Sequence, residues 1–182
     1  MALKNHTKIK KKTLKIASES ILTKKIQKAK VSKQVAVFTR SSHKSQIWIK
    51  EIQKELKWMS GDNIYHLLRA VLQSLRDQLS VHESAHFAAQ LPLLLRGTFY
   101  EGWNPKTNLG PSVSKNNFLE LIKQKMNPIG IPNFELEKGV LAALNVIKKH
   151  ISAGEMKDLV GSLNPTLKVF IEKAGQQHEA LA

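Results

Sequence analysis

Apolar residues at helical spacing occur in the same order twice along this chain, and this limits its fold more than any other feature. Such residues recur every three or four positions from residue 48 to 99, and a similar series starts at residue 118. When the numbering is shifted by 70, the matching pairs are Trp48 with Phe118, Ile52 with Ile122 and Leu56 with Met126. After a slightly longer loop (128–132) the shift becomes 72, and the pairs are Leu72 with Leu144, Leu75 with Ile147, Leu79 with Ile151, Phe87 with Leu159 and Leu91 with Leu163.

The signals that start helices recur with the apolar pattern. Ser80 is followed three residues later by Glu83, which is the spacing of a capping box. Ser152 and Glu155 repeat this pair at the second of the two shifts. Agreement between caps and apolar positions over two windows indicates that one helical unit is used twice, with each copy too short to cover its own apolar face.

We expect four helices in each copy. In the first copy these are a helix over 46–58, a second helix that Asp62 caps, a third from the Ser80 capping box, and a short fourth whose first turn contains Pro92. The last helix of the second copy is predicted to have Asn164 as its cap and Pro165 at its first position.

The predicted fold class is therefore all-α, since no segment shows sustained period-two alternation. Two tandem four-helix units pack into one helical domain, preceded by an N-terminal arm and followed by a C-terminal tail. The predicted boundaries are 1–45 for the arm, 46–103 for unit one, 104–114 for the connector, 115–172 for unit two and 173–182 for the tail.

Composition excludes several classes of function. The chain has no cysteine, which excludes disulfides, thiolate zinc sites and thiol catalysis. It has no apolar run of the roughly 18–20 residues that span a bilayer, so integral membrane insertion is not expected. Its N-terminus is positively charged, but no uninterrupted apolar stretch follows as in a signal peptide. We therefore expect a cytoplasmic protein.

The net charge of +15 is concentrated in the arm. Residues 1–46 contain 13 lysine and arginine residues against one acid, which gives +12, whereas residues 47–182 contain 16 basic and 13 acidic residues, which gives +3. Lysine charge binds polyanions by releasing counterions and reads no base sequence. The candidate polyanion contacts are Lys4, Lys8, Lys10, Lys11, Lys12, Lys15, Lys24, Lys25, Lys28, Lys30 and Lys33.

Three interpretations of the arm remain open. It lacks Trp and Tyr, and its only aromatic residue is Phe38, so base stacking contributes little and binding to the nucleic-acid backbone is favoured. The segment from Thr13 to Ala29 has apolar residues at near-helical spacing, which is typical of a helix on an anionic membrane surface. In the third interpretation, the arm is a solvated tail that only aids solubility. A transit peptide would favour arginine, which is absent before Arg40.

One catalytic motif is present. His82-Glu83-Ser84-Ala85-His86 has the spacing of zinc proteases, in which two histidines bind the metal and the glutamate activates water. The capping box occupies this glutamate, however, and unit two has Gly154 and Asp158 in place of the histidines. The need for a helix cap therefore explains the residues of this turn without any metal. We expect no catalytic residues and no cofactor, and keep a zinc site at His82 and His86 as the alternative.

A second candidate site lies near the end of the fourth helix of unit one. It comprises Gln90, Arg96, Glu101 and Trp103. In a functional interpretation, these residues form a small pocket in which Arg96 receives an anion beside an aromatic wall. In a structural interpretation, Arg96 pairs with Glu101 and Trp103 fills the seam between the two units.

Three segments of unit one resemble a known family. They are Leu68–Leu79, Ala85–Gly97 and Tyr100–Pro105, which include the run Gln-Leu-Pro, Leu-Arg-Gly and Tyr-Glu-Gly-Trp. They resemble the bacterial family called domain of unknown function 2267, and the resemblance extends over about residues 46–172. It implies a small, two-part, all-helical domain with no assigned activity. The lysine arm is not part of it.

From these observations we expect a non-catalytic helical binding protein. Its arm gives sequence-independent affinity for nucleic acid, and its helical domain engages an unknown protein partner or a second copy of itself. The alternatives are a zinc-dependent hydrolase that uses the motif at His82 and His86, and a membrane-surface protein that binds through residues 13–29.

Overall fold

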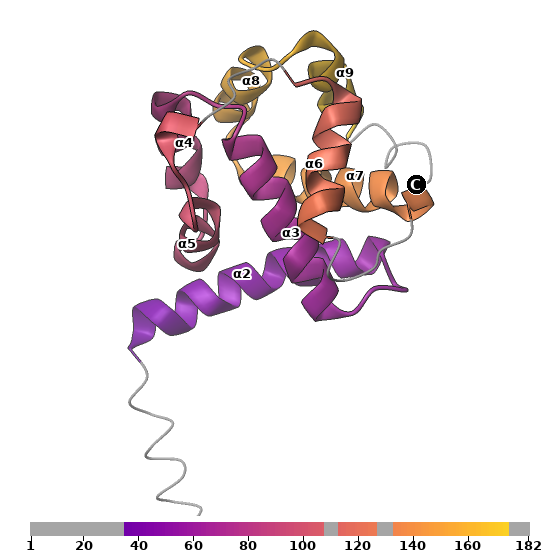
Figure 1. Cartoon of the computed structure of the whole chain (residues 1–182). Coiled ribbons are helices and arrows are strands. Elements are labelled where there is room, and N and C mark those ends of the chain that lie inside the picture. The colour runs from indigo at the N-terminus through magenta and orange to yellow at the C-terminus, as the bar shows by residue number, and fades with distance from the viewer. Residues whose placement is uncertain (1–34, 108–112, 127–132, 175–182) are drawn as a thin grey trace, which may run out of the picture. The chain divides into compact units, whose positions relative to one another are not determined.

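The computed structural model describes residues 35–107, 113–126 and 133–174. In these ranges it has eight α-helices, one short 3-10 helix and no strand, which confirms the all-α prediction. In chain order the elements are α2 (Ala36–Glu55), α3 (Gly61–Arg76), α4 (Val81–Gln90), α5 (Leu93–Tyr100), η1 (Pro105–Thr107), α6 (Lys115–Met126), α7 (Asn133–His150), α8 (Ala153–Gly161) and α9 (Pro165–Lys173) (Figure 1).

The chain divides into two compact units, residues 1–40 and 41–182, and the helical domain belongs to the second. All the arm lysines from Lys4 to Lys33, and the segment predicted to lie on a membrane surface, fall outside the described residues. Most of the predicted tail, residues 173–182, falls outside them as well. Among the helices of the described ranges, none combines the length and the apolar composition that crossing a bilayer requires.

The first described helix begins ten residues before the predicted start at residue 46. Its added residues 36–40 are exposed, and from residue 41 on its buried face starts with two polar side chains. Ser41 and Ser45 are buried at helical spacing with Trp48 and Ile52. Both hydroxyl groups have partners, since the Ser45 Oγ donates to the carbonyl of Ser41 at 2.9 Å and the Ser41 Oγ accepts from the amide of Leu94 in α5 at 3.1 Å. A search for buried apolar residues therefore missed the start of this helix.

Several of the predicted helix starts are confirmed, although Pro92 is the cap of α5 rather than a residue of its first turn. The Ser80 Oγ accepts from the Glu83 amide and the Glu83 carboxylate accepts from the Ser80 amide, which completes a capping box. At α9, Asn164 is the cap and a proline occupies the first turn. At α3 the predicted cap is wrong: Ser60 accepts from the Asn63 amide, and Asp62 lies inside the first turn instead. There its charge still favours the positive end of the helix dipole.

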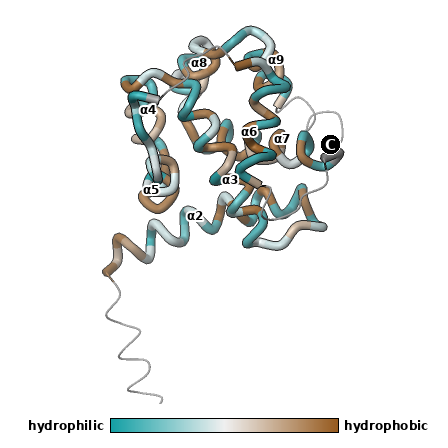
Figure 2. Tube along the Cα trace, in the orientation of Figure 1, coloured by the Kyte–Doolittle hydropathy of each residue, from teal (hydrophilic) through white to brown (hydrophobic). Residues whose placement is uncertain are grey.

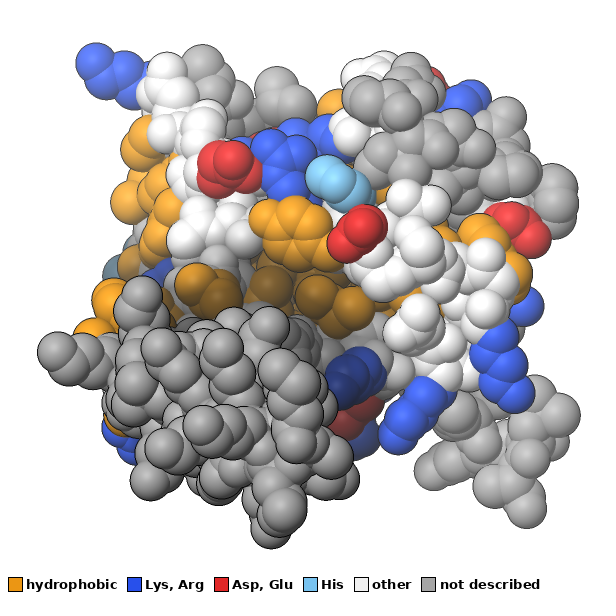
Figure 3. All heavy atoms as spheres, turned by 90° about the horizontal axis from the view of Figure 1, so that it is seen from below, with side chains coloured by type: hydrophobic (Ala, Val, Ile, Leu, Met, Phe, Trp, Pro, Cys, Tyr) orange, Lys and Arg blue, Asp and Glu red, His pale blue; other side chains and the backbone are white. Residues whose placement is uncertain are grey.

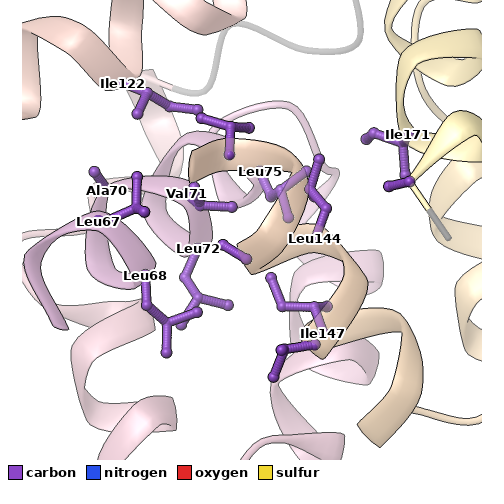
Figure 4. Close-up of a cluster of buried hydrophobic side chains, with 14 of the residues drawn as sticks. Leu67, Leu68, Ala70, Val71, Leu72, Leu75, Ile122, Leu144, Ile147 and Ile171 are labelled. Atoms are coloured by element: carbon purple, nitrogen blue, oxygen red, sulfur yellow. The ribbon is translucent and has the colours of Figure 1, made fainter. Parts of the chain in front are cut away.

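Helix α3 is the centre of the core. Residues 70–76 are all buried, so the second half of this helix is covered on every side. It packs against α5 from its own half and against α6 and α7 from the other half. Figure 4 shows α3 side chains meeting Ile122 of α6 and Leu144 and Ile147 of α7. Hydrophilic and hydrophobic residues alternate along the surrounding helices, as expected for elements with one face on this core (Figure 2).

Two of the interhelical contacts join helices that the predicted repeat relates to each other. Helix α3 packs on α7, and α4 packs on α8. Both pairs correspond to the shift of 72 in the numbering between the two copies. The tandem repeat itself stays a prediction, but its geometric consequence is that equivalent side chains of the two halves come to face each other.

Gly139 of α7 lies against the side chain of Leu67 of α3. A Cβ atom at this position would lie 3.1 Å from Cδ2 of Leu67. We expect Gly139→Val to separate the two helices and lower the free energy of unfolding by about 1–3 kcal/mol, as overpacking of cores does. Equilibrium urea unfolding measures the effect.

The matched control is Gly97→Val in α5, where an added Cβ meets no atom within 4 Å. This variant should change stability little, because valine and glycine differ modestly in an exposed helix. Equal effects of the two substitutions would show that close packing at Gly139 is not a constraint.

Candidate functional site

A groove of about 230 Å³ lies between α4 and α8, and it is lined by the three titratable side chains of the zinc-protease motif together with two acids of α8. Two leucines form its apolar floor, and histidine and acidic side chains form its sides. Its lining residues are Leu79, His82, Glu83, His86, Glu155, Asp158 and Leu159. The groove exists because both helices start with a serine cap and then pack against each other, so that their first two turns lie side by side.

The two histidines stand on the same face of α4. His82 and His86 are four residues apart, and the centroids of their rings are 4.4 Å apart at an interplanar angle of 35°. Both side chains are exposed. Glu83 points back to its own helix end, where its carboxylate accepts from the Ser80 amide at 2.8 Å. The capping function predicted for Glu83 is therefore confirmed.

The acidic side of the groove comes from α8. The Ser152 Oγ accepts from the Glu155 amide at 3.2 Å, as the Ser80 Oγ does from the Glu83 amide. Unlike Glu83, neither Glu155 nor Asp158 forms a side-chain hydrogen bond or ion pair within the described residues. Sequence reasoning identified these two acids only as counterparts of α4 residues, and it missed that they face the histidines. The signal was available in the constant shift between the two copies.

The second predicted site is not one site. The Arg96 guanidinium donates to the carbonyls of Ala88 at 2.9 Å and Ala89 at 3.2 Å, and so caps the end of α4. Glu101 instead forms an ion pair with Arg69 of α3 at 2.7 Å. The predicted pairing of Arg96 with Glu101 is therefore wrong.

Gln90 and Trp103 are the other members of that predicted site. Gln90 is exposed at the end of α4, next to Arg96, which donates to the carbonyls of the flanking Ala89 and Leu91, but within the described residues no hydrogen bond joins Gln90 to Glu101. Trp103 is partly buried, and its ring lies 5.3 Å from that of Tyr100 in the same half. Its contact across the seam between the halves stays a prediction.

The turn that follows α5 is held by side chains of α3 that sequence reasoning missed. The buried Arg76 guanidinium donates to the carbonyls of Phe99 at 2.6 Å and Glu101 at 3.1 Å. It also forms an ion pair with the neighbouring Asp77 at 2.8 Å. Gly102 provides the positive φ of 64° that the turn requires. The Tyr-Glu-Gly-Trp run thus carries out a structural task, which is to end the first half against the central helix.

A polar cluster joins α2 to the end of α7. The Glu51 carboxylate contacts His150 at 2.8 Å and Lys149 at 3.0 Å, and the His150 ring stacks on buried Trp48 at 5.0 Å. Partial burial raises the pKa of Glu51, but the hydrogen bonds and the charges of His150 and Lys149 outweigh it and hold the pKa below its ordinary value. The cluster therefore stabilises the charged carboxylate.

The fold and these sites define an all-helical domain whose two halves share one central helix. The family model described as "Uncharacterized conserved protein (DUF2267)" matches residues 45–170, which is more than half of the chain. The chain therefore belongs to the DUF2267 family, as its resemblance to that family indicated. No curated protein matches it.

We expect Arg76→Met to lower the free energy of unfolding by about 2–4 kcal/mol, because two carbonyls lose their donor and Asp77 loses one of its two basic partners. Arg69→Met is the matched control. Its side chain comes from the same helix and also bonds the turn after α5, but its ion pair is exposed, so the loss should stay under about 1 kcal/mol. Urea unfolding of both variants gives the comparison, and a larger effect at Arg69 would contradict it.

The lowered pKa of Glu51 predicts that the stability of the fold decreases at low pH. A carboxylate with a lowered folded-state pKa adds stability that is complete above its ordinary pKa of 4.5 and is lost as the pH falls through the folded-state pKa. Glu51→Gln should therefore be less stable than the natural chain at pH 7, and the difference should shrink below pH 4.5. Thermal unfolding of both proteins across this range measures the difference, and a constant gap would refute the coupling.

Proposed function

We propose that this protein is a non-catalytic binding protein whose lysine arm gives sequence-independent affinity for nucleic acid. The observation that carries the proposal is the segregation of charge, with +12 in residues 1–46 and +3 in the remainder. The proposal includes a location in the cytoplasm, where nucleic acid is accessible.

The described ion pairs support the assignment of binding to the arm. Several cations of the helical domain are already neutralised by acids of the domain itself, including Lys115 by Glu137 at 2.6 Å and Lys125 by Asp77 at 3.5 Å. A paired lysine contributes little to counterion release, because its charge is partly compensated before the polyanion arrives. Residues 1–33 contain eleven lysines and only one acid, so most of these lysines have no acid in the segment to neutralise them.

Exposed hydrophobic side chains support a protein partner or a second copy of the chain as the ligand of the helical domain. Leu93 and Leu94 of α5 are each nearly half exposed, and Trp58 is exposed to a similar degree. One face of the molecule presents hydrophobic side chains around a hollow, with charged residues beside them (Figure 3). Apolar surface of this kind beside charged residues is typical of interaction sites.

The test is nucleic-acid binding by full-length chains that carry matched substitutions. One variant has Lys8, Lys10, Lys11 and Lys12 changed to Gln. The control loses four exposed lysines of the helical domain, Lys57, Lys138, Lys157 and Lys168, by the same change. Affinity for a double-stranded DNA without a defined sequence is measured from 50 to 200 mM salt.

The arm variant should bind more weakly, and the slope of log K against log salt should fall by up to about 3.6, since each phosphate contact accounts for about 0.9. The control should keep most of the slope. Equal losses in the two variants would show that net charge rather than the arm governs binding. Retention on anionic vesicles with no affinity for DNA would instead favour the membrane-surface alternative.

A further inference from the structure

We infer that the groove between α4 and α8 is a binding site for a first-row transition-metal ion such as Zn²⁺. The ligands are two imidazoles from α4, His82 and His86, and two carboxylates from α8, Glu155 and Asp158. The ion would hold the two halves of the domain together, and no catalytic step is assigned to it.

The histidine pair provides the selectivity. Imidazole nitrogen suits zinc, copper and nickel, whereas magnesium and calcium prefer oxygen ligands. Two histidines four residues apart on one helix point in the same direction, so both rings can reach one ion. The rings of His82 and His86 are already in contact, with centroids 4.4 Å apart, and both face the groove.

The carboxylates complete a four-ligand set of the size that zinc prefers. Glu155 and Asp158 are three residues apart on α8, and both line the same groove as the histidines. Within the described ranges neither carboxylate has a side-chain partner, so an ion would not have to displace an existing bond. Their two negative charges also offset the charge of a divalent ion.

The site differs from the protease motif in the same segment. In that motif the glutamate between the histidines activates water, but Glu83 is bonded to the Ser80 amide at 2.8 Å and maintains the helix cap. The acids that face the histidines belong instead to the other half of the molecule. The arrangement is that of a structural brace, which connects two helices through one ion.

Binding requires side-chain rotation. As they stand, no three histidine or acidic side chains of the described residues are arranged to hold a metal ion. His82, His86 and Asp158 are exposed, so their rotamers can change without disturbing the core. Each ordered side chain costs on the order of 0.5–1.5 kcal/mol, which is small beside the binding energies of zinc sites with several ligands.

The experiment is titration of the full-length protein, purified without a metal column, with ZnCl2. Calorimetry gives the affinity and stoichiometry, and thermal unfolding gives the shift of the melting temperature. We expect one ion per chain, a higher melting temperature with Zn²⁺, and no shift with MgCl2. His82→Gln and His86→Gln should each weaken binding by about tenfold or more, the scale on which even outer-shell changes act.

Two further substitutions and one control decide whether the ion joins the halves. Glu155→Gln and Asp158→Asn should each weaken binding and reduce the thermal shift, whereas His43→Gln, an exposed histidine of α2, should change neither. Binding that survives both carboxylate changes would overturn the proposed brace, because the ion would then sit on α4 alone. Absence of zinc binding, or an equal loss in the His43 control, would overturn the site. Unfolding without zinc checks that each variant is folded.

Discussion

The burial of the second half of α3, residues 70–76, on every side is the constraint on which the rest of this domain depends. A helix covered all round must receive side chains from several neighbours, and here α5 covers it from one half and α6 and α7 from the other. The close approach at Gly139, where a Cβ atom would lie 3.1 Å from Leu67, is part of this contact. The polar end of the same helix performs a second task, since buried Arg76 fixes the turn that ends the first half. Apolar packing and a buried cation thus anchor both halves to one element.

Sequence alone predicted those parts of the fold that follow from local chemistry. The serine and asparagine caps are found where their spacing placed them, because a helix start is decided within four residues. Sequence failed where tertiary contacts override the local pattern. The first ten residues of α2 were missed, and Ser41 and Ser45, not apolar residues, occupy their buried positions. At α3 the error was local, because Ser60 and Asp62 are both residue types that cap helices and lie two residues apart. Arg96 and Glu101 are close in sequence, but each is bonded to a different helix.

The candidate site shows the same division. The histidines could be found from a motif, and the capping function of Glu83 could be found from the serine before it. Their acidic neighbours could not be found from local spacing, because Glu155 and Asp158 reach the groove only through the packing of α4 on α8. The repeat contained this information, since two copies that pack through equivalent helices bring equivalent positions together. Under the predicted repeat, the groove owes its mixed chemistry to His86, which corresponds to Asp158, and to His82, which corresponds to Gly154.

The shared central helix also has a consequence for how such a chain loses its structure. In arrays of repeats, each unit contacts only its neighbours, so units can melt one after another and stability is approximately a sum over units. Here α3 belongs to the first half by sequence but is enclosed by helices of both. Removal of the second half would expose the most deeply buried helix of the first. The two halves are therefore expected to lose their structure together, as one cooperative body rather than as two.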